Sequence, residues 1–199
     1  MYMDINSYKA IQQWAKDLEG VFTIADLKVA LNENAEATFY RKLDKLVNDG
    51  TLIKVKRGIY TTRDATLTTI SSRIDPTSYI STGTVLAQKA IIGSIPARKV
   101  QAVKMGRPRT YRCELGIIEH LSINPKYYFG FRPLNGILQA TPEKAYLDIC
   151  YYCFKGKSFS FNPASDINIQ DLDFGIIAGY LDRFDKRFVT FFNSIWKDQ

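Results

Sequence analysis

Apolar residues near the start of the chain recur every three or four positions in three stretches, and this spacing predicts three helices. The first is expected at 6–19 and the second at 24–31, where Thr23 and Asp26 take the N-cap and third helical positions of a loose capping box. The third follows a polar turn and stops before Gly50. We expect the first helix to pack over the other two and complete a compact unit.

The segment after the third helix is rich in residues that favour strands. Residues 51–55 and 59–61 are predicted to pair as a hairpin. The tip of this hairpin is basic and consists of Lys56, Arg57 and Gly58. Two short helices followed by a basic hairpin are typical of a winged helix-turn-helix, a domain that reads DNA. The pattern therefore predicts a DNA-binding domain over residues 1–65.

One face of the third helix carries side chains that suit the major groove of DNA. At 100° per residue, with Leu43 at the centre of the buried stripe, the opposite row has no carboxylate and holds Asn34, Thr38, Arg41, Lys45 and Asn48. Such side chains donate to base edges or phosphates, although any surface helix carries polar residues outside. The basic hairpin follows this helix at the spacing that a wing requires, and this combination favours DNA binding. The predicted DNA-binding residues are Asn34, Thr38, Arg41, Lys42, Lys45, Lys56 and Arg57.

A second domain of mixed α/β structure is predicted over 74–199, so that the whole chain is α+β. The linker is placed at 62–73, where Thr, Ser, Arg and Asp dominate. Thr141, Pro142 and Glu143 form a helix start, with a hydroxyl N-cap, a proline in the first turn and an acid near the positive end of the helix dipole. The helix that follows is apolar on most sides, and we expect it to be central and buried.

Shorter patterns predict the other elements of this domain. A helix is expected at 81–87, and strands are expected at 99–103 and 115–121. An apolar segment at 174–180 and an aromatic tail are predicted to form two more helices that pack on the central one. The large aromatic residues of the tail are Phe184, Phe188, Phe191, Phe192 and Trp196.

The chain carries 27 Lys or Arg against 20 Asp or Glu, a formal net charge of +7, and the excess lies in its middle. Residues 63–140 hold 11 basic side chains against 4 acidic ones. Six of them are predicted to lie on one face of a β-hairpin and to add phosphate contacts: Arg98, Lys99, Lys104, Arg107, Arg109 and Arg112. An acidic protein partner would suit the same face, and a solvated surface would explain it without any partner.

No catalytic residue, metal site or cofactor is predicted. Cys150 and Cys153 share the buried face of an apolar helix, where cysteine usually acts as a small hydrophobic residue. A structural zinc site needs four ligands and would have to recruit Cys113 and His120 as well. Since the chain has a single histidine, we expect His120 to be a surface residue or a histidine with satisfied hydrogen bonds.

Other signals of enzymes and membrane proteins are absent or have a structural explanation. Glu143, Lys144 and Asp148 fit helix capping and a Lys–Asp contact between positions i and i+4. The sequence has no P-loop and no glycine-rich dinucleotide-binding motif. It also has no stretch of about 18 apolar residues and no signal peptide, so no membrane association is expected. With three cysteines, this places the protein in the reducing cytoplasm.

A set of short strings spans nearly the whole chain. They are Phe22-Thr23, Asp26-Leu27, the helix end at 43–50, Arg57-Gly58-Ile59-Tyr60, Tyr79-Ile80-Ser81, Ala140-Thr141-Pro142-Glu143-Lys144-Ala145 and Leu147-Asp148. In this order they resemble the AbiEi-like antitoxins of abortive-infection toxin-antitoxin systems. The resemblance implies an N-terminal winged helix, a C-terminal antitoxin domain, repression of the chain's own operon through inverted repeats, and a nucleotidyltransferase-like toxin as partner.

We therefore expect a cytoplasmic, sequence-specific repressor that binds double-stranded operator DNA, autoregulates a toxin-antitoxin operon and neutralises its toxin. Inverted repeats would be read either by a homodimer or by two monomers bound side by side. The alternative is a protein-interaction module, or a regulator without a cognate toxin, whose basic face docks an acidic partner. An enzyme acting on RNA or nucleotides ranks last, because the sequence has no constellation of carboxylates or histidines.

Overall fold

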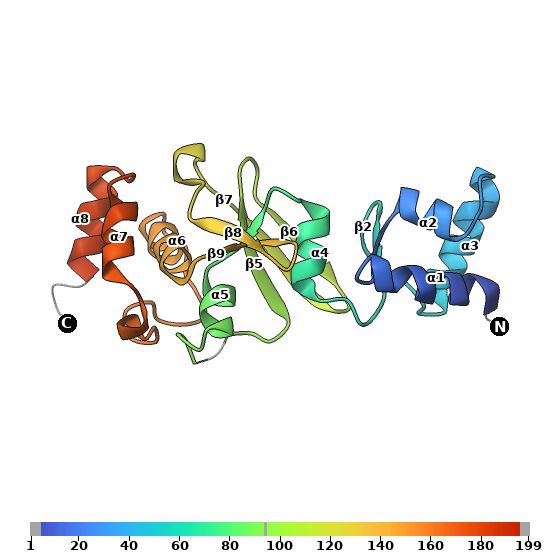
Figure 1. The fold of residues 1–199 in the computed structure, drawn as a ribbon, viewed down its shortest axis with the longest axis horizontal. Coiled ribbons are helices and arrows are strands. Elements are labelled where there is room, and N and C mark those ends of the chain that lie inside the picture. The colour runs from blue at the N-terminus through green and yellow to red at the C-terminus, as the bar shows by residue number, and fades with distance from the viewer. Residues whose placement is uncertain (1–4, 94, 196–199) are drawn as a thin grey trace.

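The computed structural model describes residues 5–93 and 95–195 of the chain. It combines helices with two separate β-sheets, which confirms the predicted α+β class. The molecule is elongated: the N-terminal helices lie at one end, the larger sheet lies in the middle, and the last two helices lie at the other end (Figure 1). Trp196, predicted to belong to the aromatic tail, lies outside the described residues.

The N-terminal unit contains three helices and a three-stranded antiparallel sheet with the strand order β1-β3-β2. Its elements are α1 (Ile5–Asp17), β1 (Val21–Thr23), α2 (Ile24–Ala30), α3 (Glu36–Asn48), β2 (Ile53–Lys56) and β3 (Ile59–Thr61). The three predicted helices and the hairpin are present, although the hairpin starts at Ile53 rather than at residue 51. Ile11, Leu27, Phe39 and Leu43 form much of the core between the helices.

The start of α2 has the predicted capping box. The Asp26 backbone N–H donates to the Thr23 hydroxyl at 3.2 Å, and the Thr23 N–H donates to the Asp26 carboxylate at 2.8 Å. These two bonds satisfy backbone donors that the first turn of a helix leaves without partners. The capping box therefore fixes the point at which β1 ends and α2 begins.

The C-terminal unit is built on a six-stranded mixed sheet with the order β6-β7-β5-β4-β9-β8. Its strands are β4 (Tyr79–Ile80), β5 (Lys99–Lys104), β6 (Arg109–Cys113), β7 (Gly116–Ser122), β8 (Phe131–Leu134) and β9 (Ile137–Ala140). Its helices are α4 (Leu67–Ile74), α5 (Gly83–Gln88), α6 (Pro142–Phe154), α7 (Phe174–Leu181) and α8 (Lys186–Ile195), with two short 3-10 helices at Pro125–Tyr127 and Ile169–Asp171. The sheet lies between α4 on one side and α6 on the other (Figure 1).

Helix α4 occupies most of the segment predicted to be a linker, so that prediction is wrong. Thr66 caps the helix, because its hydroxyl accepts a hydrogen bond from the Thr69 N–H at 3.1 Å. Ile70 is fully buried, and the helix packs on β5, β7 and β9. Leu67, Ile70 and Ile74 have helical spacing, a signal that the threonine-rich and serine-rich composition obscures.

Helix α6 is the central buried helix that the sequence predicts. The Thr141 hydroxyl accepts a hydrogen bond from the Lys144 N–H at 3.2 Å, and Pro142 stands in the first turn. All ten residues 143–152 are buried, and α5, α7 and α8 pack against the helix. The largest hydrophobic core of the protein lies here, between the sheet and these helices.

Strands β5 and β6 do not form the predicted hairpin. Strand β7 lies between them, parallel to β5 and antiparallel to β6, so Ile118 pairs with Val100 on one side and with Tyr111 on the other. The chain therefore crosses the end of β7 on its way from β5 to β6. This pairing is non-local, and the sequence between the two strands gives no sign of it.

A third hydrophobic cluster joins the two units. Val21, Val55 and Ile59 of the small sheet pack with Ile70 of α4 and Ile118 of β7. Strand β2 also lies against β6, the edge strand of the larger sheet. Because these side chains are almost fully buried, we infer that the N-terminal hairpin is held in a fixed position relative to the large sheet.

Candidate nucleic-acid interface

Helix α3 buries one face and exposes the opposite one, as its periodicity predicts. Phe39, Leu43 and Leu46 are buried, whereas Arg41 is exposed and Lys45 is half-buried. Within the described residues, neither the Arg41 guanidinium nor the Lys45 ammonium forms an ion pair. Both charges are therefore available to an external partner. Thr38 lies half-buried on the same helix, and the acidic Glu36 and Asp44 are also exposed on it.

Two residues of the predicted row have different roles in the structure. Asn34 lies in the turn before α3, because the helix begins at Glu36. Lys42 is engaged within the chain: its ammonium lies 2.9 Å from the Glu33 carboxylate, which also accepts the Ala35 N–H at 3.1 Å. The hydrogen bond from Lys42 lowers the pKa of Glu33. Lys42 thus stabilises the turn between α2 and α3.

The hairpin of β2 and β3 exposes two cations, Lys54 on β2 and Arg57 at its turn. Its two-residue turn is Arg57-Gly58, and Gly58 has φ +86°, a left-handed conformation that favours glycine. Arg57 is exposed, whereas Lys56 is half-buried and its ammonium donates to the Arg57 carbonyl oxygen at 3.2 Å. Arg57 is therefore the more accessible of the two predicted contacts.

The six basic residues of the central segment do not share one face, which corrects the prediction of a single charged hairpin. Lys99 lies 2.8 Å from Glu119, Lys104 forms an ion pair with Asp75, and the Arg98 side chain donates to the Leu115 carbonyl oxygen at 3.0 Å. The physical reason is the insertion of β7, which separates β5 from β6. The exposed residues whose side chains form neither an ion pair nor a hydrogen bond in the described part of the chain are Arg107, Arg109 and Arg112.

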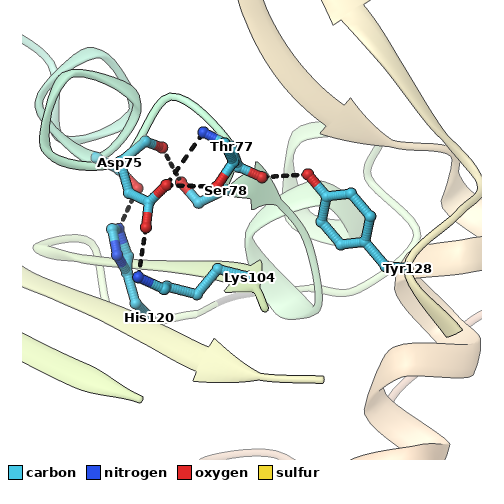
Figure 2. A network of polar contacts seen from close by, with 7 residues as sticks. Asp75, Thr77, Ser78, Lys104, His120 and Tyr128 are labelled. Atoms are coloured by element: carbon cyan, nitrogen blue, oxygen red, sulfur yellow. Dashed lines mark hydrogen bonds and ion pairs between the residues drawn. The ribbon is translucent and has the colours of Figure 1, made fainter. Parts of the chain in front are cut away.

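A polar network anchors the end of α4 to the large sheet (Figure 2). Asp75 accepts hydrogen bonds from the Thr77 N–H at 3.1 Å and the Thr77 hydroxyl at 2.6 Å, and it pairs with Lys104. Burial alone would raise the pKa of Asp75, but the hydrogen bonds from Lys104 and Thr77 outweigh it and lower the pKa. The Ser78 hydroxyl donates to the Asp75 carbonyl oxygen at 2.8 Å, and the Tyr128 hydroxyl donates to the Thr77 carbonyl oxygen.

His120 lies beneath α4 and is completely buried. Its Nε2 atom is 2.9 Å from the Ser71 hydroxyl, while Nδ1 has no hydrogen-bond partner in the described structure. Burial lowers the pKa of His120 to about 4, so the ring is neutral at pH 7. A serine beside a histidine suggests a nucleophile and its base, but Ser71 is also fully buried. The pair is therefore a structural contact between α4 and β7.

Lys144 and Asp148 of α6 form a fully buried ion pair. Asp148 also accepts hydrogen bonds from the Tyr79 hydroxyl at 3.1 Å and from the Ser81 hydroxyl at 2.7 Å. Burial raises the pKa of Asp148 and lowers that of Lys144, while their mutual attraction opposes both shifts. The predicted i, i+4 contact is confirmed; its complete burial and its two partners around β4 are new.

The cysteines are free thiols. Cys150 is buried on α6, and burial raises the pKa of its thiol to about 12, so it is protonated and unreactive. Among the described residues, no three His, Cys, Asp or Glu side chains come together as a metal site would require. The described helices also include none that is both long and apolar enough to cross a membrane.

Sequence reasoning missed the polar contacts that hold α4 against the N-terminal unit. Arg73 lies 3.0 Å from Asp26, and the Thr69 hydroxyl donates to Glu19 at 3.2 Å. The members of these pairs are 47 and 50 positions apart in the sequence, so no local pattern relates them. Together with the apolar cluster around Ile70, they make α4 the connection between the small sheet and the large one.

Comparison with known proteins finds a structural neighbour for this arrangement. No family model matches the chain, and no curated protein matches it in sequence. The crystal structure of the RV2827C protein from Mycobacterium tuberculosis is similar, with a TM-score of 0.61 and 13% sequence identity. The match covers 98% of this chain and 78% of that one. The two proteins share a fold. At this identity, the likeness extends to the fold alone.

Proposed function

We propose that this protein is a cytoplasmic, sequence-specific DNA-binding repressor whose N-terminal unit is a winged helix. In this reading α3 is the recognition helix, and the hairpin of β2 and β3 is the wing. The observation that carries the proposal is the free charge of Arg41 and Lys45 on a helix that is followed directly by a hairpin with Arg57 at its tip. Arg41 and Lys45 then contact base edges, and Arg57 contacts the phosphate backbone.

Three arginines of the large sheet extend the proposed DNA surface. Strand β2 lies against β6, so the wing adjoins the edge strand that carries Arg109 and Arg112, and Arg107 lies in the loop just before β6. Such exposed cations add phosphate contacts that are independent of sequence. Asn34 and Thr38 remain contacts of the proposal at the entry to α3, whereas Lys42 and Lys56 support the local structure.

The resemblance to AbiEi-like antitoxins supports a wider role. We propose that the protein binds inverted repeats in its own promoter and that the C-terminal unit neutralises a nucleotidyltransferase-like toxin. A twofold operator suits either a homodimer or two monomers side by side. This part of the proposal rests on the resemblance, whereas DNA binding also rests on the exposed charges of α3 and the wing.

A protein-interaction module is the second candidate, because the N-terminal unit exposes several large apolar side chains. Ile5 is 61% exposed, Val29 62% and Tyr40 43%, and they lie on three different helices. Exposed apolar side chains are common singly, but a group of them marks many protein interfaces. In this alternative the basic surface binds an acidic protein rather than DNA.

The deciding experiment measures binding of the protein to its own promoter and to a scrambled duplex of equal length. We expect a preference for the promoter that persists at roughly 150–200 mM salt. The double variant R41A/K45A should lose at least about tenfold in promoter affinity. The matched control K9A/K16A removes two exposed charges from α1 and should retain the preference. Equal, salt-sensitive binding of both duplexes by the native protein would reject the repressor and favour the interaction module.

A further inference from the structure

A small, partly open cavity lies where three segments of the C-terminal unit meet. Its volume is about 50 Å³. Thr84 of α5, Lys99 and Gln101 of β5, and Ser158 and Ser160 of the loop after α6 provide its polar lining. No part of the proposed winged helix contributes to this cavity.

Lys99 is the charged residue of the cavity lining, and it belongs to a group of charges with Glu119 and Lys157, which lie just outside the lining. Glu119 forms two ion pairs. One carboxylate oxygen lies 2.8 Å from the Lys99 ammonium, and the other lies 2.6 Å from the Lys157 ammonium. Gln101 also donates to this carboxylate, at 2.8 Å. Although partial burial alone would raise the pKa of Glu119, the hydrogen bonds from Lys157, Lys99 and Gln101 outweigh it and lower the pKa to about 2. Two ammonium groups therefore face one permanent carboxylate, which leaves one unit of positive charge.

Hydroxyl groups without acceptors also line the cavity. The Thr84 side chain is 5% exposed, and its oxygen accepts the Gln101 backbone N–H at 3.0 Å. In the described structure the Thr84 hydroxyl proton has no acceptor, whereas Ser158 and Ser160 are exposed and their hydroxyls form no hydrogen bond within the described residues. A buried donor is stabilised by an acceptor, and the Thr84 hydroxyl is placed to donate to an anion in this cavity.

The backbone that positions Thr84 is strained. Thr82 has φ +55° and ψ −144°, a conformation that residues other than glycine rarely adopt. A hydrogen bond of 2.7 Å from its hydroxyl to Gln101 holds it there. The next residue must be small, because a Cβ atom on Gly83 would lie 2.9 Å from the Phe161 ring. This tight packing fixes α5 against the loop that closes the cavity.

We propose that this cavity binds a phosphate-sized oxyanion, free or as the terminal group of a phosphorylated small molecule. Ammonium and hydroxyl donors are the side-chain groups that recognise such anions, and the volume admits one tetrahedral group. Ser160 and Phe161 also line a neighbouring open hollow of about 300 Å³, which offers room for an organic group attached to the anion. This site is independent of the proposed DNA binding.

The test is a titration of the full chain with inorganic phosphate at constant ionic strength, followed by calorimetry and by amide shifts in NMR spectra. We expect saturable binding, with the shifts concentrated in α5, at the start of β5 and in residues 157–161. Titration with adenosine monophosphate distinguishes the two sources: tighter binding than phosphate indicates a phosphomonoester, and weaker binding indicates the free anion.

Variants of the lining residues separate this site from general attraction of anions to a basic protein. K99M and T84V should each weaken phosphate binding by roughly tenfold or more, since each removes a donor to the anion. T84S keeps the hydroxyl and should keep the affinity, which controls for effects of T84V on folding. K126M removes an exposed charge elsewhere and should bind normally. Shifts scattered over surface lysines, or equal affinity of T84V and T84S, would overturn the proposal.

Discussion

The proposed recognition helix and wing of the N-terminal unit and the central helix α6 of the C-terminal unit hold their charged side chains in opposite environments. In the N-terminal unit, Arg41, Lys45 and Arg57 lie at or near the surface, and none of them forms an ion pair within the described residues. In the C-terminal unit, Lys144 and Asp148 are completely buried against each other. A charge that stays in water loses no hydration free energy and remains available to a partner. A charge that is buried is tolerated only where its partners are fixed.

The difference separates residues that bind from residues that specify the fold. Buried Asp148 has three partners from two elements: Lys144 on its own helix, and Tyr79 and Ser81 on or next to β4. Those contacts fix the position of α6 relative to β4. Changes in the N-terminal unit should therefore alter affinity at constant stability, whereas changes in the buried group should alter stability first.

The largest expected effect is the loss of one partner of the buried ion pair. K144M leaves the Asp148 carboxylate buried with two hydroxyl donors, and the free energy of unfolding should fall by about 3–5 kcal/mol. Urea unfolding measures this change. The exposed control K126M should stay within about 0.5 kcal/mol of the native protein.

A second variant keeps that measurement informative if K144M fails to fold. K144M/D148L removes both charges and should regain most of the lost stability, because an apolar pair of similar volume often replaces a buried ion pair at little cost. A single variant K144M as stable as the native protein would show that Tyr79 and Ser81 suffice for Asp148. The contrast between the two units would then be much weaker.

The next effect in size concerns buried His120 and acid. The pKa of His120 is about 4 in the folded protein and 6.5 ordinarily. Between these two pH values the unfolded chain therefore binds a proton on His120 and the folded chain does not. Stability is therefore retained above about pH 6.5 and falls as the pH drops toward 4, by up to about 3 kcal/mol. Unfolding curves of the native protein and of H120Q at pH 7.5, 6, 5 and 4 test this, and H120Q should lack most of the loss.

Ser71 provides the control for the histidine. S71A removes the hydrogen bond to His120 Nε2 but leaves the imidazole to titrate. It should lower stability by a similar amount at every pH, with the same slope as the native protein. Parallel curves for H120Q and the native protein would mean that the pKa of His120 is the same in the folded and the unfolded chain.

The parts of the fold that could be predicted have local signals. The capping box at Thr23, the turn at Arg57-Gly58 and the Thr141-Pro142 start of α6 each act within a few residues, and each element begins or turns where it was predicted. The insertion of β7 between β5 and β6 depends on pairing between distant segments, so the predicted hairpin there was wrong. Helix α4 is an intermediate case. Its apolar residues have helical spacing, which is a local signal, but its composition resembles that of a linker.

The candidate site divides in the same way. Helical periodicity was sufficient to place Arg41 on the exposed face of α3, since that placement depends only on the buried stripe around Leu43. It was not sufficient for Lys42 or Lys104, whose partners Glu33 and Asp75 lie 9 and 29 positions away. Whether a charge is free is a property of the tertiary structure, so a count of basic residues overstates the surface available to DNA.

The smallest expected effect tests that last point with two residues that the sequence treats alike. Arg107 is exposed in the loop before β6, whereas Lys104 is paired with Asp75 beneath α4. If exposed cations extend the DNA surface, R107A should reduce the slope of log affinity against log salt by about 1. K104A should leave that slope unchanged. It should instead lower the free energy of unfolding, because the half-buried Asp75 carboxylate loses its ion-pair partner. Binding to promoter DNA across a salt series, together with urea unfolding of both variants, provides the measurement. Equal changes in slope for the two variants would show that the basic segment acts through its total charge, and the distinction between free and paired cations would have no bearing on binding.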